Sequence, residues 1–577
     1  MRRSAAWSAA FPIILSAVFA RGVSQTPRPT DKANENVLVR VEKPMAAPEP
    51  CRLGFSTITG RDSRALLSYL SSDLLEGRET GTRGYRLAAD YAASLFALWG
   101  LEPAGDAGTG GGRGYLQEVV MKEYAGLGCT AAWSVNEGSN AGGRTFHEGV
   151  DLENYYRNRI PENISGPVVF AGYGLSDRSI AYDDFAGLDL KGKIVMILDE
   201  APGQGDPASP FMKGHGGEKP RPVIWFDALK KANAVAAQGA RAVLVVRNSI
   251  AAGDVYTEME PVAKDDERPI IAEPTRLVTL PGAKRGGGAI FISREMADAL
   301  LASSGQTIES LKAEIESRWK PASFEIAGGI LTIRNSAESE RLLRCHNVVG
   351  LIPGSDPRLT GEAVIIGAHL DHLGKRGDYV FNGADDNGSG VTGVLEIARA
   401  VAALPKKPKR SIVFCLWTAE ELGLLGSAAY LKHPVFPPAQ TVAYLNLDMI
   451  GRAADDESLR SRLKRLKVPA EAQNKIAAGN FAVVAFPAGQ GLGELLGRAD
   501  QAVGLDLWLQ AEAGVKDSGI VSDYLAFAQA GVPYLYWAGT THKDYHQTSD
   551  GFEKINLELM TKIIRLAYLV ALTVADQ

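Results

Sequence analysis

The segment 363–390, AVIIGAHLDHLGKRGDYVFNGADDNGSG, joins an apolar run to a turn rich in glycine and acidic residues. The opening run has the length and the β-branched content of a buried strand. His369 and Asp371 follow this run directly, and Asp386 lies in the turn. The residues after the turn, 390–403, have the apolar spacing of a helix. The segment therefore predicts a strand, a turn and a helix, with polar groups at the carboxyl end of the strand.

Three further apolar runs of strand length follow along the chain, at 411–417, 441–447 and 532–537. A second helix is expected over 421–431. Strands that alternate with helices are typical of a mostly parallel sheet with helices on both faces. The fold class predicted from these patterns is α/β, with a mostly parallel central sheet flanked by helices.

Polar side chains follow each of these later runs. Glu420 and Glu421 come after the first, Asp448 ends the second, and His546 lies beyond the third. In an open parallel sheet, ligands bind outside the carboxyl ends of the strands, so these loops can meet in one crevice. Two imidazoles and three carboxylates suit zinc, which takes nitrogen and oxygen ligands at about 2.0–2.2 Å.

Each of these residues also has an ordinary structural interpretation. A lone Glu-Glu pair is usually a solvated helix start, and Asp385-Asp386 alone would be a turn. The hypothesis of a metal site therefore depends on their joint occurrence in this order. His372 and His542 are expected to neighbour the ligands rather than bind metal, and Asp385 is expected to support a ligand.

Five short motifs resemble the successive signatures of the cocatalytic zinc aminopeptidases, a family that also contains glutamate carboxypeptidases and the transferrin receptor ectodomain. The resemblance covers roughly 60–125 and 340 to the C-terminus. One departure is SDY at 522–524, where many members have Ser-Asp-His, and it puts details of the pocket in doubt. The motifs are GAHLD (367–371), GADDNGSG (383–390), TAEELG (418–423), NLDMIG (446–451) and YH (545–546).

The resemblance implies a site for two Zn²⁺ ions. His369 and Asp448 would bind one ion, Glu421 and His546 would bind the other, and Asp386 would bridge both. It also implies a cis peptide bond after Asp386, between that residue and Asn387.

Three more residues have catalytic roles by the same resemblance. Glu420 would act as the general base on a water shared by the two metals and deliver its proton to the leaving amine. Asp371 would accept a hydrogen bond that fixes the imidazole of His369. Tyr545 would donate a hydrogen bond to the developing oxyanion.

The N-terminus predicts export. Arg2 and Arg3 precede an apolar run over 5–20, so we expect a signal peptide, 1–20, cleaved after Ala20. The alternative, a membrane anchor, would need about 20 apolar residues. The mature protein is expected to be periplasmic or extracellular without a membrane span. The Pro- and Ala-rich segment 21–55 is predicted to be a flexible leader.

The rest of the chain divides into a peptidase domain, 56–145 and 335–577, and an inserted module, 150–320. Short β-branched runs in the module predict a smaller, β-rich α/β domain. FAGYG (170–174) and LKGKIV (190–195) resemble pieces of the protease-associated domain. The module could gate substrates or bind partners, or it could be a passive insert.

The amino-acid composition argues against nucleic-acid binding and against a disulfide-built scaffold. The 577 residues include 62 basic and 67 acidic residues, so no positive excess favours nucleic-acid binding. Four cysteines are too few for a disulfide-built scaffold.

The leading prediction is an aminopeptidase that acts on peptides. The alternatives are a carboxypeptidase or dipeptidase on the same site, a receptor-like protein without activity, and a cyclase of N-terminal glutamine. Oligomeric state, disulfide pairing and side-chain preference stay open.

Overall fold

The structure is a computed structural model of the whole chain. The predicted signal peptide, 1–20, lies outside the described residues, and no helix within the described part is long and apolar enough to cross a membrane. The structure describes residues 36–41, 43–108, 111–135, 143–154, 163–203, 206, 209–211, 225–247, 276–282, 289–466, 468–512, 521–539 and 542–577.

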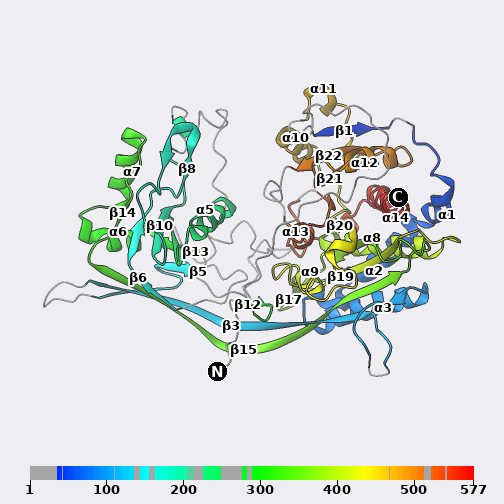
Figure 1. Cartoon of the computed structure of the whole chain (residues 1–577), viewed down its shortest axis with the longest axis horizontal. Helices are drawn as coiled ribbons and strands as arrows, with labels where there is room; N and C mark the ends of the chain where they lie inside the picture. Colours follow the sequence, from blue (N-terminus) through cyan, green and yellow to red (C-terminus); the bar gives the residue numbers. More distant parts are fainter. Residues whose placement is uncertain are drawn as a thin grey trace, which may run out of the picture.

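A 13-stranded mixed sheet forms the centre of the larger lobe (Figure 1). The four central strands β19, β16, β20 and β23 run parallel to one another. The outer pairings are antiparallel except that of β21 with β22. The prediction of a parallel sheet therefore holds for the centre, whereas the edges are antiparallel. The strands in spatial order are β1 (Val37–Arg40), β22 (Asp506–Glu512), β21 (Phe481–Pro487), β23 (Tyr534–Ala538), β20 (Thr441–Asp448), β16 (Ala363–His369), β19 (Ser411–Trp417), β15 (Gly329–Ile352), β3 (Leu116–Val135) and β12 (Arg276–Thr279), with β2 (Glu102–Pro103), β4 (Arg144–His147) and β6 (Ile164–Gly166) beside this path.

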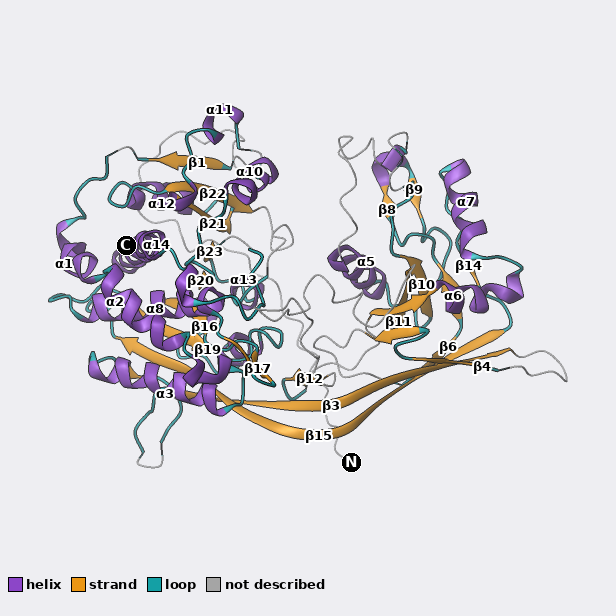
Figure 2. Cartoon of the chain, turned by 180° about the vertical axis from the view of Figure 1, so that it is seen from behind, coloured by secondary structure: helices purple, strands orange, loops and turns teal. Residues whose placement is uncertain are grey.

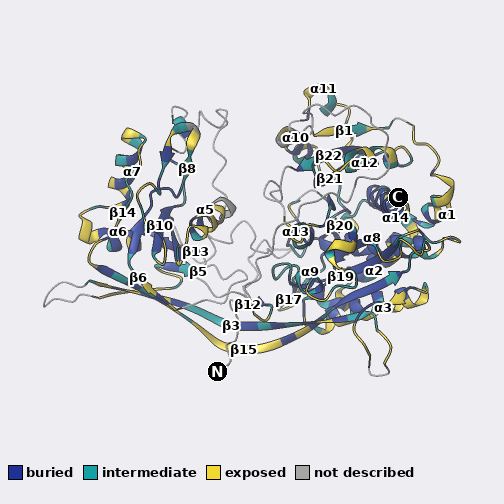
Figure 3. Cartoon of the chain, in the orientation of Figure 1, coloured by how far each residue is buried: buried dark blue, intermediate teal, exposed yellow. Residues whose placement is uncertain are grey.

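The central strands are buried on both faces, which explains why they read as continuous apolar runs (Figure 3). Successive side chains of a strand point to opposite faces. Val364 and Ile366 of β16 accordingly pack into one core, and Ala363 and Ile365 into another. The first core is covered by α2 (Gly60–Leu70), α3 (Arg83–Leu98), α8 (Gly390–Ala402) and α14 (Leu557–Asp576), and the second by α9 (Leu425–Tyr430) and α13 (Tyr524–Gln529).

A second, six-stranded sheet forms a smaller lobe with cores of its own. The long strands β3 and β15 pair side by side and connect the two lobes (Figure 2). The boundaries 150–320 and the resemblance to a protease-associated domain stay predictions. The elements of this lobe are β14 (Phe324–Glu325), β7 (Val168–Phe170), β10 (Ile194–Leu198), β11 (Ala242–Arg247), β13 (Ala289–Ser293), β5 (Leu152–Asn154), β8 (Ser176–Asp177), β9 (Tyr182–Asp183), α5 (Trp225–Ala237), α6 (Arg294–Leu301) and α7 (Ile308–Arg318).

Two local predictions need correction. The expected leader contains ordered elements, because β1 pairs with β22 and α1 (Glu49–Thr57) packs against α8 and α14. The helix expected from Glu421 begins only at Leu425, since Asp371 holds the preceding turn through the amides of Glu420 and Glu421. Other elements that the sequence patterns did not predict are the hairpin β17 (Gly374–Arg376) and β18 (Tyr379–Phe381), α10 (Asp456–Arg465), α11 (Ala470–Gln473), α12 (Leu492–Asp500), β21 and β22.

Candidate metal centre

The fold brings all five predicted metal ligands to the carboxyl ends of the central strands. His369 is the last residue of β16, and Asp448 is the last residue of β20. Glu421 lies in the turn after β19, Asp386 in the turn before α8, and His546 beyond β23. Neighbouring parallel strands end at one edge, so side chains scattered along the sequence meet there.

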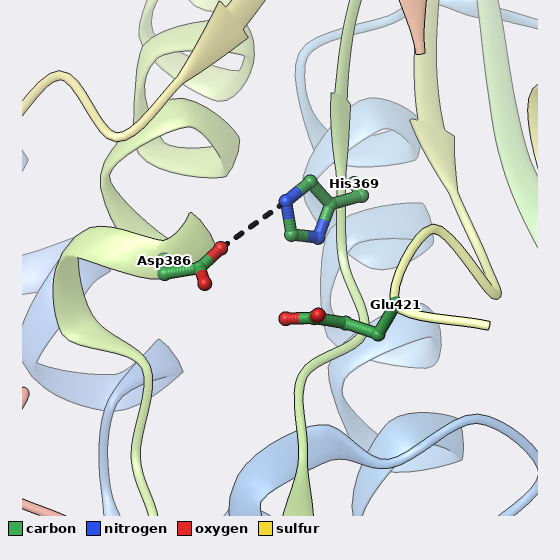
Figure 4. Close-up of side chains that lie close together, drawn as sticks. All are labelled: His369, Asp386 and Glu421. Carbon is green, nitrogen blue, oxygen red and sulfur yellow. Dashed lines mark ion pairs between the residues drawn. The ribbon is translucent and has the colours of Figure 1, made fainter. Parts of the chain in front are cut away.

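The carboxylate of Asp386 stands between the two histidines. Its Oδ1 lies 3.3 Å from Nε2 of His369, and its Oδ2 lies 3.2 Å from Nε2 of His546. His369 Nε2 is also 3.5 Å from Oδ1 of Asp448, and His546 Nε2 is 3.1 Å from Oε2 of Glu421. The five residues thus form two groups of one imidazole and one further carboxylate each, and Asp386 belongs to both. Figure 4 shows the side chains of His369, Asp386 and Glu421 converging on a common space.

These donor atoms fit a cation. Oδ2 of Asp386, Oδ1 of Asp448 and Nε2 of His546 are buried and have no hydrogen-bond partner among the described residues. Buried polar atoms without partners are rare, and a bound ion is one explanation for them. Imidazole nitrogens and carboxylate oxygens are the donor types that zinc takes.

Charge interactions between the imidazoles and the carboxylates shift the pKa values of the ligands. Burial opposes a charge on His546, yet the carboxylates of Glu421 and Asp386 raise its pKa to about 10. Burial likewise works against the Glu421 carboxylate, but His546 and His372 lower its pKa to about 2. The Glu421 carboxylate is therefore ionised and can neutralise positive charge, and a divalent cation would take the place of the proton on His546, because histidine binds metal as the neutral imidazole.

Glu420 differs from its neighbour Glu421. Burial raises the pKa of Glu420 well above its ordinary value, and the charges of Glu421 and Asp523 add to the rise against the opposing effect of His369. Donor atoms of Glu420, His369 and Asp448 lie within 4.8 Å of one another. A carboxyl group that can keep a proton beside the ligands suits general acid–base work.

The predicted role of Asp371 changes in the structure. Nδ1 of His369 lies 3.1 Å from the backbone carbonyl oxygen of Asp371, whereas the Asp371 carboxylate is 4.0 Å away. The carbonyl accepts a hydrogen bond from the Nδ1–H group of His369. Nε2 of the same ring then carries the lone pair that can bind a metal ion. The carboxylate instead accepts hydrogen bonds from the amides of Glu420 and Glu421. Sequence patterns cannot show that the backbone carbonyl of Asp371, and not its carboxylate, bonds to His369, because every residue has a carbonyl oxygen.

Tyr545 lies against the ligands through its ring. The ring stacks on the imidazole of His546 with centroids 3.8 Å apart. Burial and the carboxylates of Asp386 and Glu421 raise the pKa of Tyr545 well above its ordinary value, so its hydroxyl keeps its proton. A hydrogen bond from this hydroxyl to an oxyanion stays a prediction.

The turn that carries Asp386 is held by Asp550, which the sequence patterns did not predict, and by Asn387. The carboxylate of Asp550 accepts hydrogen bonds from the backbone amides of Asp385 and Asp386. The side chain of Asn387 donates to the carbonyl of Leu447. The expected cis peptide bond between Asp386 and Asn387 is confirmed. No motif marks Asp550, since its role depends only on its position in space.

The neighbouring histidines contact ligands or their supports. Nδ1 of His372 lies 2.8 Å from Oε1 of Glu421. Nε2 of His542 lies 3.2 Å from Oδ2 of Asp385, and Oδ1 of Asp385 accepts the amide proton of Gly451. His372 thus lies beside a ligand, as expected, whereas His542 contacts Asp385 next to the ligand Asp386.

Residues 347–571, which hold all of these ligands, match the sequence model of Peptidase family M28. The match covers this part of the chain alone. A probable glutamate carboxypeptidase of Arthroderma benhamiae is 34% identical to the chain over 216 residues, which are 35% of this chain and 26% of the relative. Leucine aminopeptidase 1 of Trichophyton rubrum is 37% identical over 112 residues, 18% of this chain and 29% of the relative.

The chain thus spans 26% and 29% of the length of these two relatives of the M28 domain. Among solved structures, an aminopeptidase from Aneurinibacillus sp. strain AM-1 aligns over 90% of this chain and 95% of its own, with 19% identity and a TM-score of 0.46. A zinc aminopeptidase from Bacillus subtilis aligns over 90% of this chain and 96% of its own, with 18% identity and a TM-score of 0.43.

Proposed function

We propose that this protein is an exported zinc-dependent aminopeptidase with two zinc ions in its M28 domain. The observation that carries the proposal is the position of Asp386, whose two carboxylate oxygens each face a different histidine. A bridging carboxylate is what a two-metal site needs. His369 and Asp448 would hold one ion, and Glu421 and His546 the other.

The chain's own residues supply the remaining chemistry. Bound zinc would act as a Lewis acid that polarises the substrate carbonyl and acidifies water. Glu420 takes a proton from the attacking water and returns it to the leaving amine nitrogen. Tyr545 donates a hydrogen bond to the oxygen that becomes negative. The backbone carbonyl of Asp371 keeps His369 in the tautomer whose Nε2 faces the site.

An amine terminus fits the charges around the site better than a carboxylate terminus. The arginines that neighbour the Asp386 turn already face acceptors of this chain, Arg78 backbone carbonyls and Arg452 the carboxylates of Asp544 and Asp550. Further carboxyl groups stand close by in Glu420 and Asp523. Carboxyl oxygens accept hydrogen bonds from the ammonium group of a peptide N-terminus, whether or not the carboxyl group keeps its proton.

The test is a panel of aminoacyl reporter substrates compared with peptides that report cleavage at the C-terminus. The full-length chain is loaded with zinc and assayed at neutral pH. We expect release of N-terminal residues, with activity lost in chelator and restored by zinc. Release of C-terminal residues alone would support the carboxypeptidase alternative, and activity that persists in chelator would exclude the metal site as the catalyst.

The export part of the proposal rests on the N-terminal sequence. It predicts that the chain isolated from its native cells begins at Arg21 and occurs outside the cytoplasm. N-terminal sequencing of the isolated protein tests this, because an intact Met1 in the mature form would contradict the cleavage.

A further inference from the structure

Arg78 is a buried cation beside the metal centre, although it lies outside the part of the chain that matches the family model. Only 1% of the residue is exposed. Its guanidinium donates hydrogen bonds from Nε to the carbonyl of Leu370 at 3.0 Å, from Nη1 to that of Asn382 at 2.7 Å, and from Nη2 to that of Gly383 at 2.9 Å. Nη1 also donates to the carbonyl of Leu70.

Apart from the carbonyl of Leu70 on α2, these carbonyls belong to the loop after His369 and to the segment that leads into the Asp386 turn. Leu370 directly follows His369, and Gly383 opens the turn that carries Asp386. A guanidinium is planar and holds its N–H groups in a rigid fork. One side chain therefore sets the position of one loop relative to the other.

Thr80 makes a second connection on the same short segment. Its hydroxyl donates to Oδ2 of Asp371 at 3.1 Å and accepts the amide proton of Ala419 at 3.0 Å. The carboxylate of Asp371 in turn accepts the amide protons of Glu420 and Glu421. Thr80 thus reaches the turn that presents the base and a metal ligand.

The backbone of this segment is held in a sharp turn. Glu76, Gly77 and Arg78 all have positive φ angles, of 49°, 68° and 51°. Two of them are not glycine, a conformation that persists only where surrounding contacts enforce it. A Cβ atom on Gly77 would lie 2.2 Å from the carbonyl oxygen of Gly374, so the hairpin of β17 and β18 packs directly on the turn.

The positive charge of Arg78 also affects the carboxylates of the metal centre. Burial lowers the pKa of Arg78 to about 10, so the side chain stays positive at neutral pH, and the charges of Asp386 and Asp550 oppose this lowering more than those of other groups do. A fixed positive charge beside clustered carboxylates reduces their mutual repulsion before metal enters. The cost of burying this cation is offset by its four hydrogen bonds.

We propose that Arg78 and Thr80 are positioning residues that preorganise the metal centre: Arg78 fixes the separation of His369 and Asp386, and Thr80 fixes the turn of Glu420 and Glu421. The proposal rests on the proposed function only in that the five ligands bind zinc. By this proposal the segment that contains Arg78 and Thr80 supports the metal centre, in addition to packing against the sheet.

The experiment measures zinc affinity of the full-length, metal-free chain by competition with a chromophoric chelator, together with the visible spectrum of the Co²⁺ form. Groups that orient metal ligands typically contribute about 10–100-fold to metal affinity. We expect Arg78→Met to weaken zinc binding by about this factor, and Arg78→Lys to weaken it less. Thr80→Val should weaken binding and alter the Co²⁺ spectrum, whereas Thr80→Ser should restore both.

Arg565→Met is the matched control. Arg565 lies on α14, which carries no metal ligand, and it also donates to a backbone carbonyl, that of Ile58. It should lower the unfolding temperature without changing zinc affinity. If Arg78→Met and Thr80→Val both bind zinc within twofold of the unmodified chain, the proposal is overturned. If Arg78→Met fails to fold, the comparison of Thr80→Val with Thr80→Ser decides, and equal zinc affinity in these two variants overturns the proposal. Because no substrate is used, tight zinc binding without peptidase activity would refute the proposed function and leave this inference standing.

Discussion

Glu420 and Glu421 are adjacent in sequence, yet their surroundings give them opposite proton affinities. The Glu421 carboxylate faces two imidazoles, which lower its pKa to about 2. The Glu420 carboxyl is buried near other carboxylates, which raises its pKa well above the ordinary value. The resemblance already assigns Glu421 as a ligand and Glu420 as the base, and the three-dimensional surroundings supply the physical reason for the difference.

Glu420→Gln should therefore bind zinc normally and lose most of its turnover, by about 10²–10⁴-fold, the usual contribution of a general acid–base group. The amide has nearly the same shape as the carboxyl group but cannot accept the proton of the attacking water. Steady-state kinetics with a zinc titration measures both effects. Glu457→Gln, at an exposed position on α10, is the control. A Glu420→Gln variant with near-normal kcat would remove Glu420 from the mechanism.

At the scale of elements, the central strands were predictable and their surroundings were not. β16 and β19 are buried along their whole length, so composition alone marks them. The start of α9 depends on contacts that Asp371 makes from another loop, and these leave no local pattern. The position of Arg78 likewise depends on the carbonyls of residues nearly three hundred positions away.

Helix α8 carries a prediction about stability. Glu396 on this helix is buried beside Arg399, and one of its carboxylate oxygens has no partner among the described residues. Burial raises the pKa of Glu396 to about 7 despite the attraction of Arg399. The unfolded carboxyl group loses its proton near pH 4.3, about the ordinary value. In this window the folded state binds more protons, so stability falls as the pH rises from about 4.5 to about 7.

Glu396→Gln removes this titration. The variant should unfold at about the temperature of the unmodified chain at pH 5, and its relative stability should increase towards pH 8. The difference is at most about 4 kcal/mol, from about 1.4 kcal/mol for each pKa unit. Thermal unfolding at several pH values measures it. Glu558→Gln, whose side chain is 80% exposed, should show no such trend. A constant difference between pH 5 and pH 8 would contradict the assigned titration.

At the scale of the whole molecule, two lobes with separate cores are joined by the paired strands β3 and β15. The middle of β15, residues 336–342, is exposed, so little buried apolar surface connects the lobes there. All five metal ligands belong to the larger lobe. Cooperative unfolding requires shared buried contacts, so the lobes should unfold as separate units.

Zinc should consequently stabilise only one of these units. A ligand that binds the folded state alone adds RT ln(1 + [L]/Kd), about 2.7 kcal/mol at a hundredfold excess over Kd. Scanning calorimetry of the full-length chain should show two transitions, and a chelator should lower the temperature of one while the other stays fixed. His546→Ala should shift the same transition as the chelator, because it removes a ligand from the larger lobe alone. One transition that moves as a whole with zinc would show instead that the ribbon of β3 and β15 transmits stability between the lobes.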